Sequence, residues 1–268
     1  MSAKFLSAPV GSPVPCKLSV TSFPASSPVK LSLILGTVAA LADIFGGLVL
    51  VRRDWEKRYL RYFVALGAGF MMAAAFLEML PESFKFSMEW APVLVLGGYC
   101  AIHLLEHTIT PHFHFGEETH HDEFLTIRTG NSVLLGLAVH ALFDGVAIGS
   151  GFALSNWLGW IIFFAIFLHK IPEGFTVASV MVASGRSRTN AFYSAVVLAV
   201  ATLAGVLVIG LLPHWVRFGL PISAGVAIYV AATDLVPEVN REPGIRMALV
   251  FFSGVLIFFL LRLLAPAI

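Results

Sequence analysis

Long apolar stretches follow one another along most of the chain, and short polar segments separate them. An α-helix rises 1.5 Å per residue, so about 20 apolar residues cross a hydrocarbon layer of ~30 Å. We therefore predict an all-α integral membrane protein with eight transmembrane helices. Their ranges are 31–51, 62–80, 91–110, 131–152, 157–184, 190–211, 218–236 and 247–265.

The composition agrees with a chain that lies in a lipid bilayer. Of the 268 residues 58% are hydrophobic and only 12% are charged, whereas a soluble protein of this size would carry more lysine and glutamate. The formal net charge of +1 does not indicate a nucleic-acid partner. The two cysteines, Cys16 and Cys100, form neither a disulfide framework nor a zinc-ribbon spacing.

Residues 1–30 differ from the rest, because they are rich in serine and proline and contain no acidic residue. We expect a disordered tail there, followed by a membrane domain at 31–268. A targeting peptide is the alternative, since organellar transit sequences share this composition. The plasma (inner) membrane is the expected location, and an organellar membrane is expected if the tail is a targeting peptide.

The loops predict the orientation of the chain. Those after spans one, three, five and seven contain ten lysines and arginines, whereas the opposite side has three besides the lysines of the tail. Cytoplasmic loops carry the excess of positive charge, so both termini are predicted to lie outside.

Two segments of the chain are similar to each other. "GAGFMMAAAFLEMLPES" (67–83) and "SAGVAIYVAATDLVPEV" (223–239) align without gaps at an offset of 156 residues. Glu78 of the first corresponds to Asp234 of the second, and both precede Pro-Glu. The segments fall in spans two and seven, which cross in opposite directions, so the pattern predicts an inverted repeat.

Histidines and acids recur at one spacing in spans four and five. "HALFDGVAIG" contains His140 and Asp144, and "HKIPEG" contains His169 and Glu173. Residues i and i+4 share a helix face, so two adjacent helices can direct two imidazoles and two carboxylates to one point near the membrane midplane. Such donors suit a divalent first-row ion. A single buried pair could be an ordinary polar contact, but two copies favour a metal.

These motifs, together with the acid-x-x-Pro-Glu ends of spans two and seven, resemble the ZIP family of metal transporters, and most of all its GufA-like branch. The resemblance runs from about residue 31 to the end. It implies eight spans arranged three, two and three, with the outer triplets related by inversion, and a binuclear centre between spans four and five. It also implies transport of Zn²⁺, with Fe²⁺, Mn²⁺ or Cd²⁺ as further substrates, toward the cytoplasm. A homodimer is a candidate assembly.

Carried over by position, the resemblance gives a ligand set. The primary site comprises His140, His169 and Glu173, with Met71 as a soft fourth ligand and Met72 as the competing choice. Asp144 matches an acid that contacts the second site in binuclear members.

Three positions depart from the binuclear pattern. Ala141, Lys170 and Thr202 stand where binuclear members have an asparagine and two acids. We infer a mononuclear site in which the Lys170 ammonium takes the place of the second cation and offsets Asp144 and Glu173.

Other polar side chains lie in or near the spans, and they are candidate stations along an ion path. The alternative is helix-end solvation or interhelical hydrogen bonding. These residues are Asp43, Glu78, His103, Glu106 and Asp234.

The cytoplasmic loop at about 111–130 contains "HFHFGEETHHDE". Such a histidine-rich tract is typical of weak, exchangeable metal binding, and a solvated loop is the alternative. Its histidines are His112, His114, His120 and His121.

The leading hypothesis is a passive or weakly coupled zinc carrier without a catalytic cofactor, because no nucleotide-binding G-x-x-x-x-G-K-[ST] motif is present. Movement of the span four and five pair against the repeated triplets would alternate access to the site. The runner-up is an intramembrane zinc hydrolase, although His169 is followed by Lys170 rather than by the glutamate of H-E-x-x-H. A haem-bearing electron carrier is a third hypothesis, but it gives Asp144 and Glu173 no role.

Overall fold

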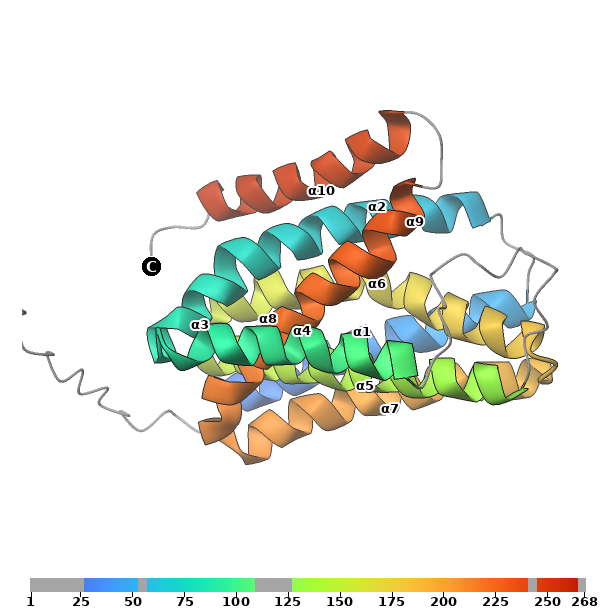
Figure 1. Cartoon of the computed structure of the whole chain (residues 1–268), viewed down its shortest axis with the longest axis horizontal. Coiled ribbons are helices and arrows are strands. Elements are labelled where there is room, and N and C mark those ends of the chain that lie inside the picture. Colours follow the sequence, from blue (N-terminus) through green and yellow to red (C-terminus); the bar gives the residue numbers. More distant parts are fainter. Residues whose placement is uncertain (1–26, 53–56, 109–126, 241–244, 265–268) are drawn as a thin grey trace, which may run out of the picture.

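The computed structural model describes residues 27–52, 57–108, 127–240 and 245–264, and helices account for nearly all of them (Figure 1). These described residues contain no β-strand, which confirms the predicted all-α class. The long helices are α1 (Ser27–Arg52), α2 (Lys57–Ala74), α4 (Trp90–Thr108), α5 (Ile127–Leu154), α6 (Asn156–Ala183), α7 (Arg188–Leu211), α8 (Val216–Tyr229) and α10 (Ile245–Leu264).

Seven helical stretches among the described residues are long and apolar enough to cross a membrane. They correspond to seven of the eight predicted spans. The eighth, 91–110, is represented by α4, which has 19 residues and is not one of the seven. His103, Glu106 and His107 lie in its last turns and lower its hydropathy. The chain is thus an integral membrane protein whose described residues are helical.

The similar segments in spans two and seven share an irregularity that the sequence did not predict. The π-helical turn η1 (Ala75–Met79) joins α2 to α3 (Leu80–Phe86), and η4 (Val230–Leu235) joins α8 to α9 (Val236–Asn240). In the first, Leu80 N–H donates to the Ala75 oxygen, and in the second Val236 N–H donates to the Ala231 oxygen. Each donor precedes a proline, which has no amide hydrogen and so disturbs the regular pattern.

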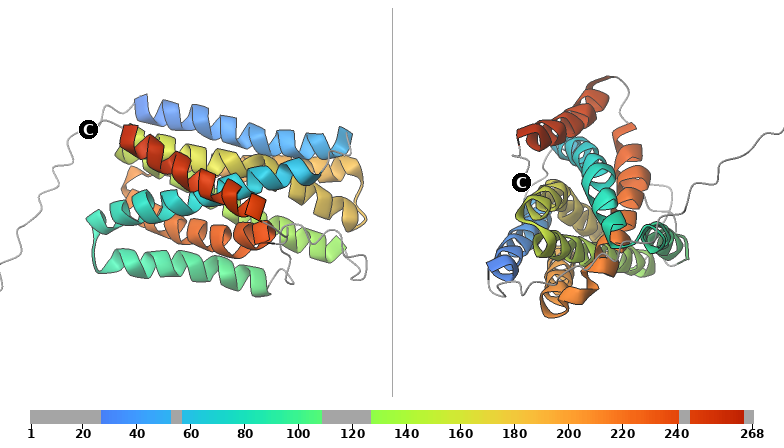
Figure 2. Two further views of the ribbon diagram at one scale, coloured as in Figure 1. Left: turned by 90° about the horizontal axis from the view of Figure 1, so that it is seen from above. Right: turned by 90° about the vertical axis from the view of Figure 1, so that its left-hand side faces the viewer.

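The helices run alongside one another and form two sets. In one set α1, α5, α6 and α7 contact each other, while in the other α10 packs on α2 and α4 packs on α8 (Figure 2). The sets meet where α2 contacts α6 and where α5 contacts α8. In α6 78% of the most apolar stretch is buried, against 17% in α10, so α6 lies at the centre.

Matching contacts hold α10 on α2 and α4 on α8. A side chain at Gly69 would collide with the main-chain oxygen of Phe251, and one at Gly225 would collide with that of Val95. Gly69 and Gly225 are 156 residues apart, and so are Val95 and Phe251, which is the offset between the two similar segments. The same close backbone contact therefore occurs twice. Gly69 of α2 meets Phe251 of α10, and the equivalent Gly225 of α8 meets the equivalent Val95 of α4.

Two predictions concern the segments between and before the helices. Helix α1 begins at Ser27, four residues before the predicted span. Residues 27–30, which were predicted to belong to the tail, are therefore helical. Residues 1–26 lie outside the described residues. The same holds for 109–126, which contain the four loop histidines, whereas 127–130 belong to α5.

Candidate metal centre

Helices α5 and α6 form an antiparallel pair connected at Ser155. The Ser155 hydroxyl accepts a hydrogen bond from the Leu158 amide at 3.1 Å. Ser155 thus caps the N-terminus of α6, which begins at the next residue, Asn156. His140 lies 14 residues before the end of α5, and His169 lies 13 residues after the start of α6. The two histidines consequently reach the same depth.

Four side chains of this helix pair converge. Ligand atoms of His140, Asp144, His169 and Glu173 all lie within 4.8 Å of one another, and all four residues are buried. This is the single group of three or more His, Cys, Asp and Glu residues with metal-binding spacing among the described residues. The i,i+4 spacing on each helix accounts for the convergence.

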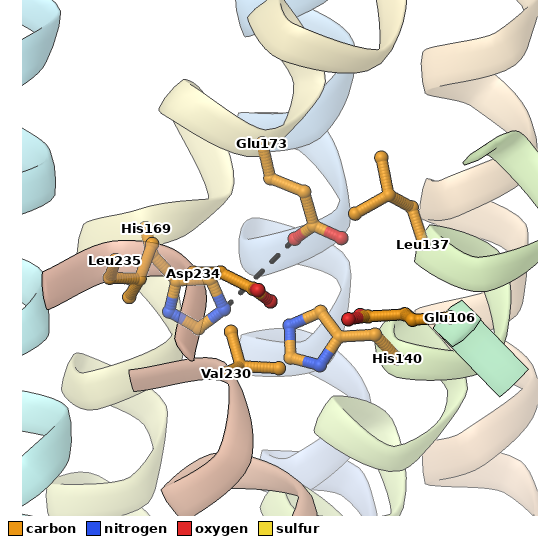
Figure 3. Close-up of a pocket in the computed structure, with 8 residues that line it drawn as sticks. All are labelled: Glu106, Leu137, His140, His169, Glu173, Val230, Asp234 and Leu235. Carbon is orange, nitrogen blue, oxygen red and sulfur yellow. Dashed lines mark ion pairs between the residues drawn. The ribbon is translucent and has the colours of Figure 1, made fainter. Parts of the chain in front are cut away.

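The Asp144 carboxylate lies between the two imidazoles. Its Oδ2 atom is 3.3 Å from His140 Nε2 and 3.3 Å from His169 Nε2. Glu173 Oε2 is 4.0 Å from His169 Nε2, and the dashed line in Figure 3 marks this pair. Ligands at about 2.0 Å from a tetrahedral zinc ion are separated by about 3.3 Å. The two Asp144 distances match this separation, whereas Glu173 would have to move closer to His169 to share an ion with it.

Several atoms at the centre that could bind a metal ion lack hydrogen-bond partners. Both ring nitrogens of His140 and the Oε1 atom of Glu173 are buried and have none. Leaving buried polar atoms unsatisfied costs about 1–3 kcal/mol each, so an ion that binds them would remove this cost. His169 Nδ1 differs, because it lies 3.0 Å from the main-chain oxygen of Ala165.

Lys170 is fully buried beside the centre, and carboxylates surround its ammonium group. Its Nζ atom lies 2.7 Å from Glu173 Oε2, 2.9 Å from Asp144 Oδ2 and 3.5 Å from Asp43 Oδ2. Asp43 comes from α1 and is also fully buried. The sequence indicated the first two neighbours, whereas the position of Asp43 depends on how α1 packs on α6.

A pocket opens from the centre toward α4 and η4. Figure 3 shows the imidazoles of His140 and His169 facing each other, with Asp234 and Glu106 directed toward them from other helices. Asp234 lies in the π-helical turn η4, and Glu106 accepts a 2.8 Å hydrogen bond from the Tyr229 hydroxyl. The pocket is lined by Glu106, Leu137, His140, His169, Glu173, Val230, Asp234 and Leu235.

The other predicted residues lie away from this pocket. Met71 is buried in the core around α2 and does not line the pocket. The centroid of the exposed His103 ring lies 4.0 Å from that of His107, and the two rings are tilted by 40°. Glu78 forms an ion pair with Arg262 at 3.2 Å and faces α10.

Sequence reasoning missed the Tyr229–Glu106 and Arg262–Glu78 contacts, which join helices far apart in the sequence. Asp43 gave a detectable signal, because a lone acid in an apolar span is rare without a function. The sequence did not reveal that its neighbour is Lys170.

The chain matches the family model described as ZIP zinc transporter over residues 27–133 and 117–262, which together cover almost all of the described structure. The chain belongs to the ZIP zinc transporter family.

Relatives within this family are similar over parts of their length. The Caenorhabditis briggsae zinc transporter zipt-7.1 is 30% identical over 107 residues, which are 37% of this chain and 27% of that protein. The Homo sapiens zinc transporter SLC39A7 is 31% identical over 131 residues, covering 44% and 27%. The Micropogonias undulatus zinc transporter ZIP9 is 30% identical over 159 residues, covering 55% and 50%. The matches thus span about a quarter to a half of these ZIP relatives.

Proposed function

We propose that this ZIP-family chain transports a divalent metal cation, with Zn²⁺ as the principal substrate, across the membrane. The observation that carries the proposal is the buried group of His140, Asp144, His169 and Glu173, whose ligand atoms lie within 4.8 Å of one another. Imidazole and carboxylate ligands suit Zn²⁺, and they also suit Fe²⁺, Mn²⁺ and Cd²⁺. In the proposed cycle the ion exchanges water for these ligands at the membrane midplane and is then released on the other side.

The proposed direction is toward the cytoplasm. The positive-inside rule places both termini outside and the 109–126 loop in the cytoplasm. The pocket contains Glu106, which lies near the α4 end that leads into this loop. Asp234 and Glu106 would therefore receive the ion after it leaves the centre, and His103 would follow them. Glu78, paired with Arg262, belongs to the opposite, outer end.

We propose an inverted relation between the first and last three spans, with α5 and α6 between them. The matched π-helical turns and the matched Gly69 and Gly225 contacts support this arrangement. Inverted repeats permit two related conformations that expose one site to opposite sides. The motif "HKIPEG" supports assignment to the GufA-like branch.

A single ion is the proposed content of the centre. The Lys170 ammonium lies within 3 Å of oxygens of both Asp144 and Glu173, and so it stands where a second cation would contact them. Asp144 completes a set of four ligands for Zn²⁺ with the two histidines and Glu173. Met71, which the resemblance gave as a soft fourth ligand, does not line the pocket, so the proposed ligand set contains no thioether.

The decisive experiment is uptake of zinc into proteoliposomes, quantified by elemental analysis. We expect uptake by the wild type and loss of uptake in His140→Ala and Glu173→Ala. His214→Ala is the matched control, since His214 is an exposed histidine outside the centre. Equal uptake by all four proteins would refute the site, and no uptake by any correctly folded protein would refute the transport function.

The histidine-rich loop supports a second, regulatory proposal. Its four histidines would bind zinc weakly in the cytoplasm and adjust transport to the zinc concentration. Deletion of 112–121 should then change how uptake depends on zinc, and an unchanged dependence would remove this role.

A further inference from the structure

Asp43 is the buried acid that the proposed ligand set leaves without a role. It lies in the middle of α1, its exposed fraction is 0%, and neither of its carboxylate oxygens has a hydrogen-bond partner. Its nearest cation is the Lys170 ammonium at 3.5 Å. A buried carboxylate is strongly unfavourable unless a cation lies close by, so the position of Lys170 is important for Asp43.

The carboxylates of the three acids surround the ammonium group of Lys170. Around the Lys170 Nζ atom, Glu173 lies at 2.7 Å, Asp144 at 2.9 Å and Asp43 at 3.5 Å. Two of these carboxylates also belong to the candidate metal centre, while Asp43 contacts only the ammonium side. With three carboxylates and one ammonium the cluster has a formal charge of −2, which one divalent cation neutralises.

A comparison of two helix interfaces shows what is unusual about Asp43. A side chain at Gly174 would collide with the main-chain oxygen of Asp43, and one at Gly145 would collide with that of Thr202. Only glycine allows these approaches, and each glycine directly follows an acid of the centre. Asp43 on α1 and Thr202 on α7 therefore occupy corresponding places beside α6 and α5.

The two places differ in charge. On α6, Lys170 follows His169 and forms an ion pair with Asp43 of α1. At the corresponding positions, Ala141 follows His140 on α5 and Thr202 lies on α7, and neither residue is charged. The Thr202 hydroxyl is buried and has no hydrogen-bond partner. The acid and the ammonium thus occur together on one side of the centre, and both are absent on the corresponding side.

We propose that Asp43 is the third carboxylate of a cation cage that the Lys170 ammonium fills, and that this cage limits the centre to one divalent ion. Asp43 is a positioning residue, because it acts on the transported ion through Lys170. The inference rests on the proposed metal centre and extends it to a residue of α1. Removal of the ammonium would leave Asp43, Asp144 and Glu173 around an open place for a second divalent cation.

The test is the number of Mn²⁺ ions bound per chain by the purified full-length protein, measured by equilibrium dialysis with elemental analysis. We expect one ion in the wild type and two in Lys170→Met. The two neighbouring ions should also show spin coupling in the electron paramagnetic resonance spectrum. The double variant Lys170→Met with Asp43→Asn should return to one ion, since the cage then has lost a carboxylate.

Single variants provide a second measurement. Asp43→Asn should weaken Mn²⁺ binding by about 10- to 100-fold, as loss of an outer partner of a metal ligand commonly does, and Asp43→Glu should restore part of the affinity. Thr202→Val is the matched control at the corresponding place and should bind like the wild type. If Lys170→Met is not recovered as a folded protein, this comparison still decides the role of Asp43.

The outcomes separate the inference from the proposed function. One ion in both the wild type and Lys170→Met, or two ions in the double variant, would overturn the cage. Equal affinities of Asp43→Asn and Thr202→Val would do the same. Absence of any bound ion in the folded wild type would instead overturn the proposed metal centre itself.

Discussion

His169 Nδ1 lies 3.0 Å from the main-chain oxygen of Ala165, one turn earlier on α6. A carbonyl oxygen only accepts, so Nδ1 donates its hydrogen to it, while Nε2 lies 3.3 Å from Oδ2 of the Asp144 carboxylate. The Nε2 atom is then the nitrogen that faces the centre, in the orientation that second partners commonly impose on metal-binding histidines. His140 has no such partner on either ring nitrogen.

This difference predicts distinct behaviour of the two rings in nitrogen-15 NMR of histidine-labelled protein. His169 should keep its hydrogen on Nδ1 with and without zinc, because the Ala165 oxygen holds it there. His140 should change its tautomer or its shift markedly when zinc binds. Coordination of zinc through Nδ1 of His169 would contradict the prediction, and the exposed His214 serves as an internal reference.

The pH dependence of transport follows from the same ligands. Zinc needs the unprotonated ring nitrogens of His140 and His169, so protons compete with it. Protonation of a ring nitrogen removes the lone pair that would bind the ion, so the apparent KM for zinc should rise as the pH falls. The measurement is uptake at several pH values, equal on both sides of the liposome and at zero membrane potential. A KM that stays constant as the pH is lowered would argue against imidazole ligands.

The sequence was sufficient for the parts of the centre that depend on one helix at a time. The i,i+4 spacing of His140 with Asp144, and of His169 with Glu173, predicted which side chains share a face, and the short turn between α5 and α6 brought the faces together. The sequence did not predict contacts between helices that are far apart along the chain. Asp43 meets Lys170 only because glycines let α1 approach α6 closely, and no periodicity reports such a contact.

The π-helical turns illustrate a second limit. Glu78 and Asp234 were expected near regular helix ends, but both lie in turns with i→i+5 hydrogen bonds. The prolines that follow were visible in the sequence and explain a disturbance, but not its form. The turn around Asp234 belongs to the pocket of the centre, whereas the turn around Glu78 faces Arg262.

The acids at the pocket should affect the rate of transport more than binding. Asp234 and Glu106 line the pocket but do not belong to the group of four ligands. Asp234→Asn and Glu106→Gln should therefore lower the maximal uptake rate several-fold and leave the equilibrium zinc affinity within about threefold. Uptake kinetics and zinc titration of the same preparations test this. A loss of affinity as large as that of Glu173→Ala would place these acids in the primary site.

The ion pair between Arg262 and Glu78 should contribute little to stability. The Arg262 side chain is 46% exposed, and exposed pairs contribute about 0.2–1 kcal/mol. A double-mutant cycle with Arg262→Gln and Glu78→Gln should give a coupling energy of this size in reversible unfolding. A coupling above about 2 kcal/mol would show that the pair holds α10 on α2.

Close packing of α1 on α6 gives the last prediction. A side chain at Gly174 would meet the main-chain oxygen of Asp43, and backbone atoms yield less easily than a flexible side chain. Gly174→Ala should therefore destabilise the protein by about 1–3 kcal/mol or more and weaken zinc binding, because Glu173 and Asp43 would be displaced.

Gly97→Ala is the matched control for that substitution. Nothing lies within 4 Å of the place that its Cβ would take, and alanine is the better helix former, so α4 should be unchanged or more stable by up to about 1 kcal/mol. Thermal unfolding in detergent and zinc titration compare the two variants. Equal unfolding temperatures would mean that α1 can move away from α6 without loss, and the cage formed by Asp43 would then lack its structural basis.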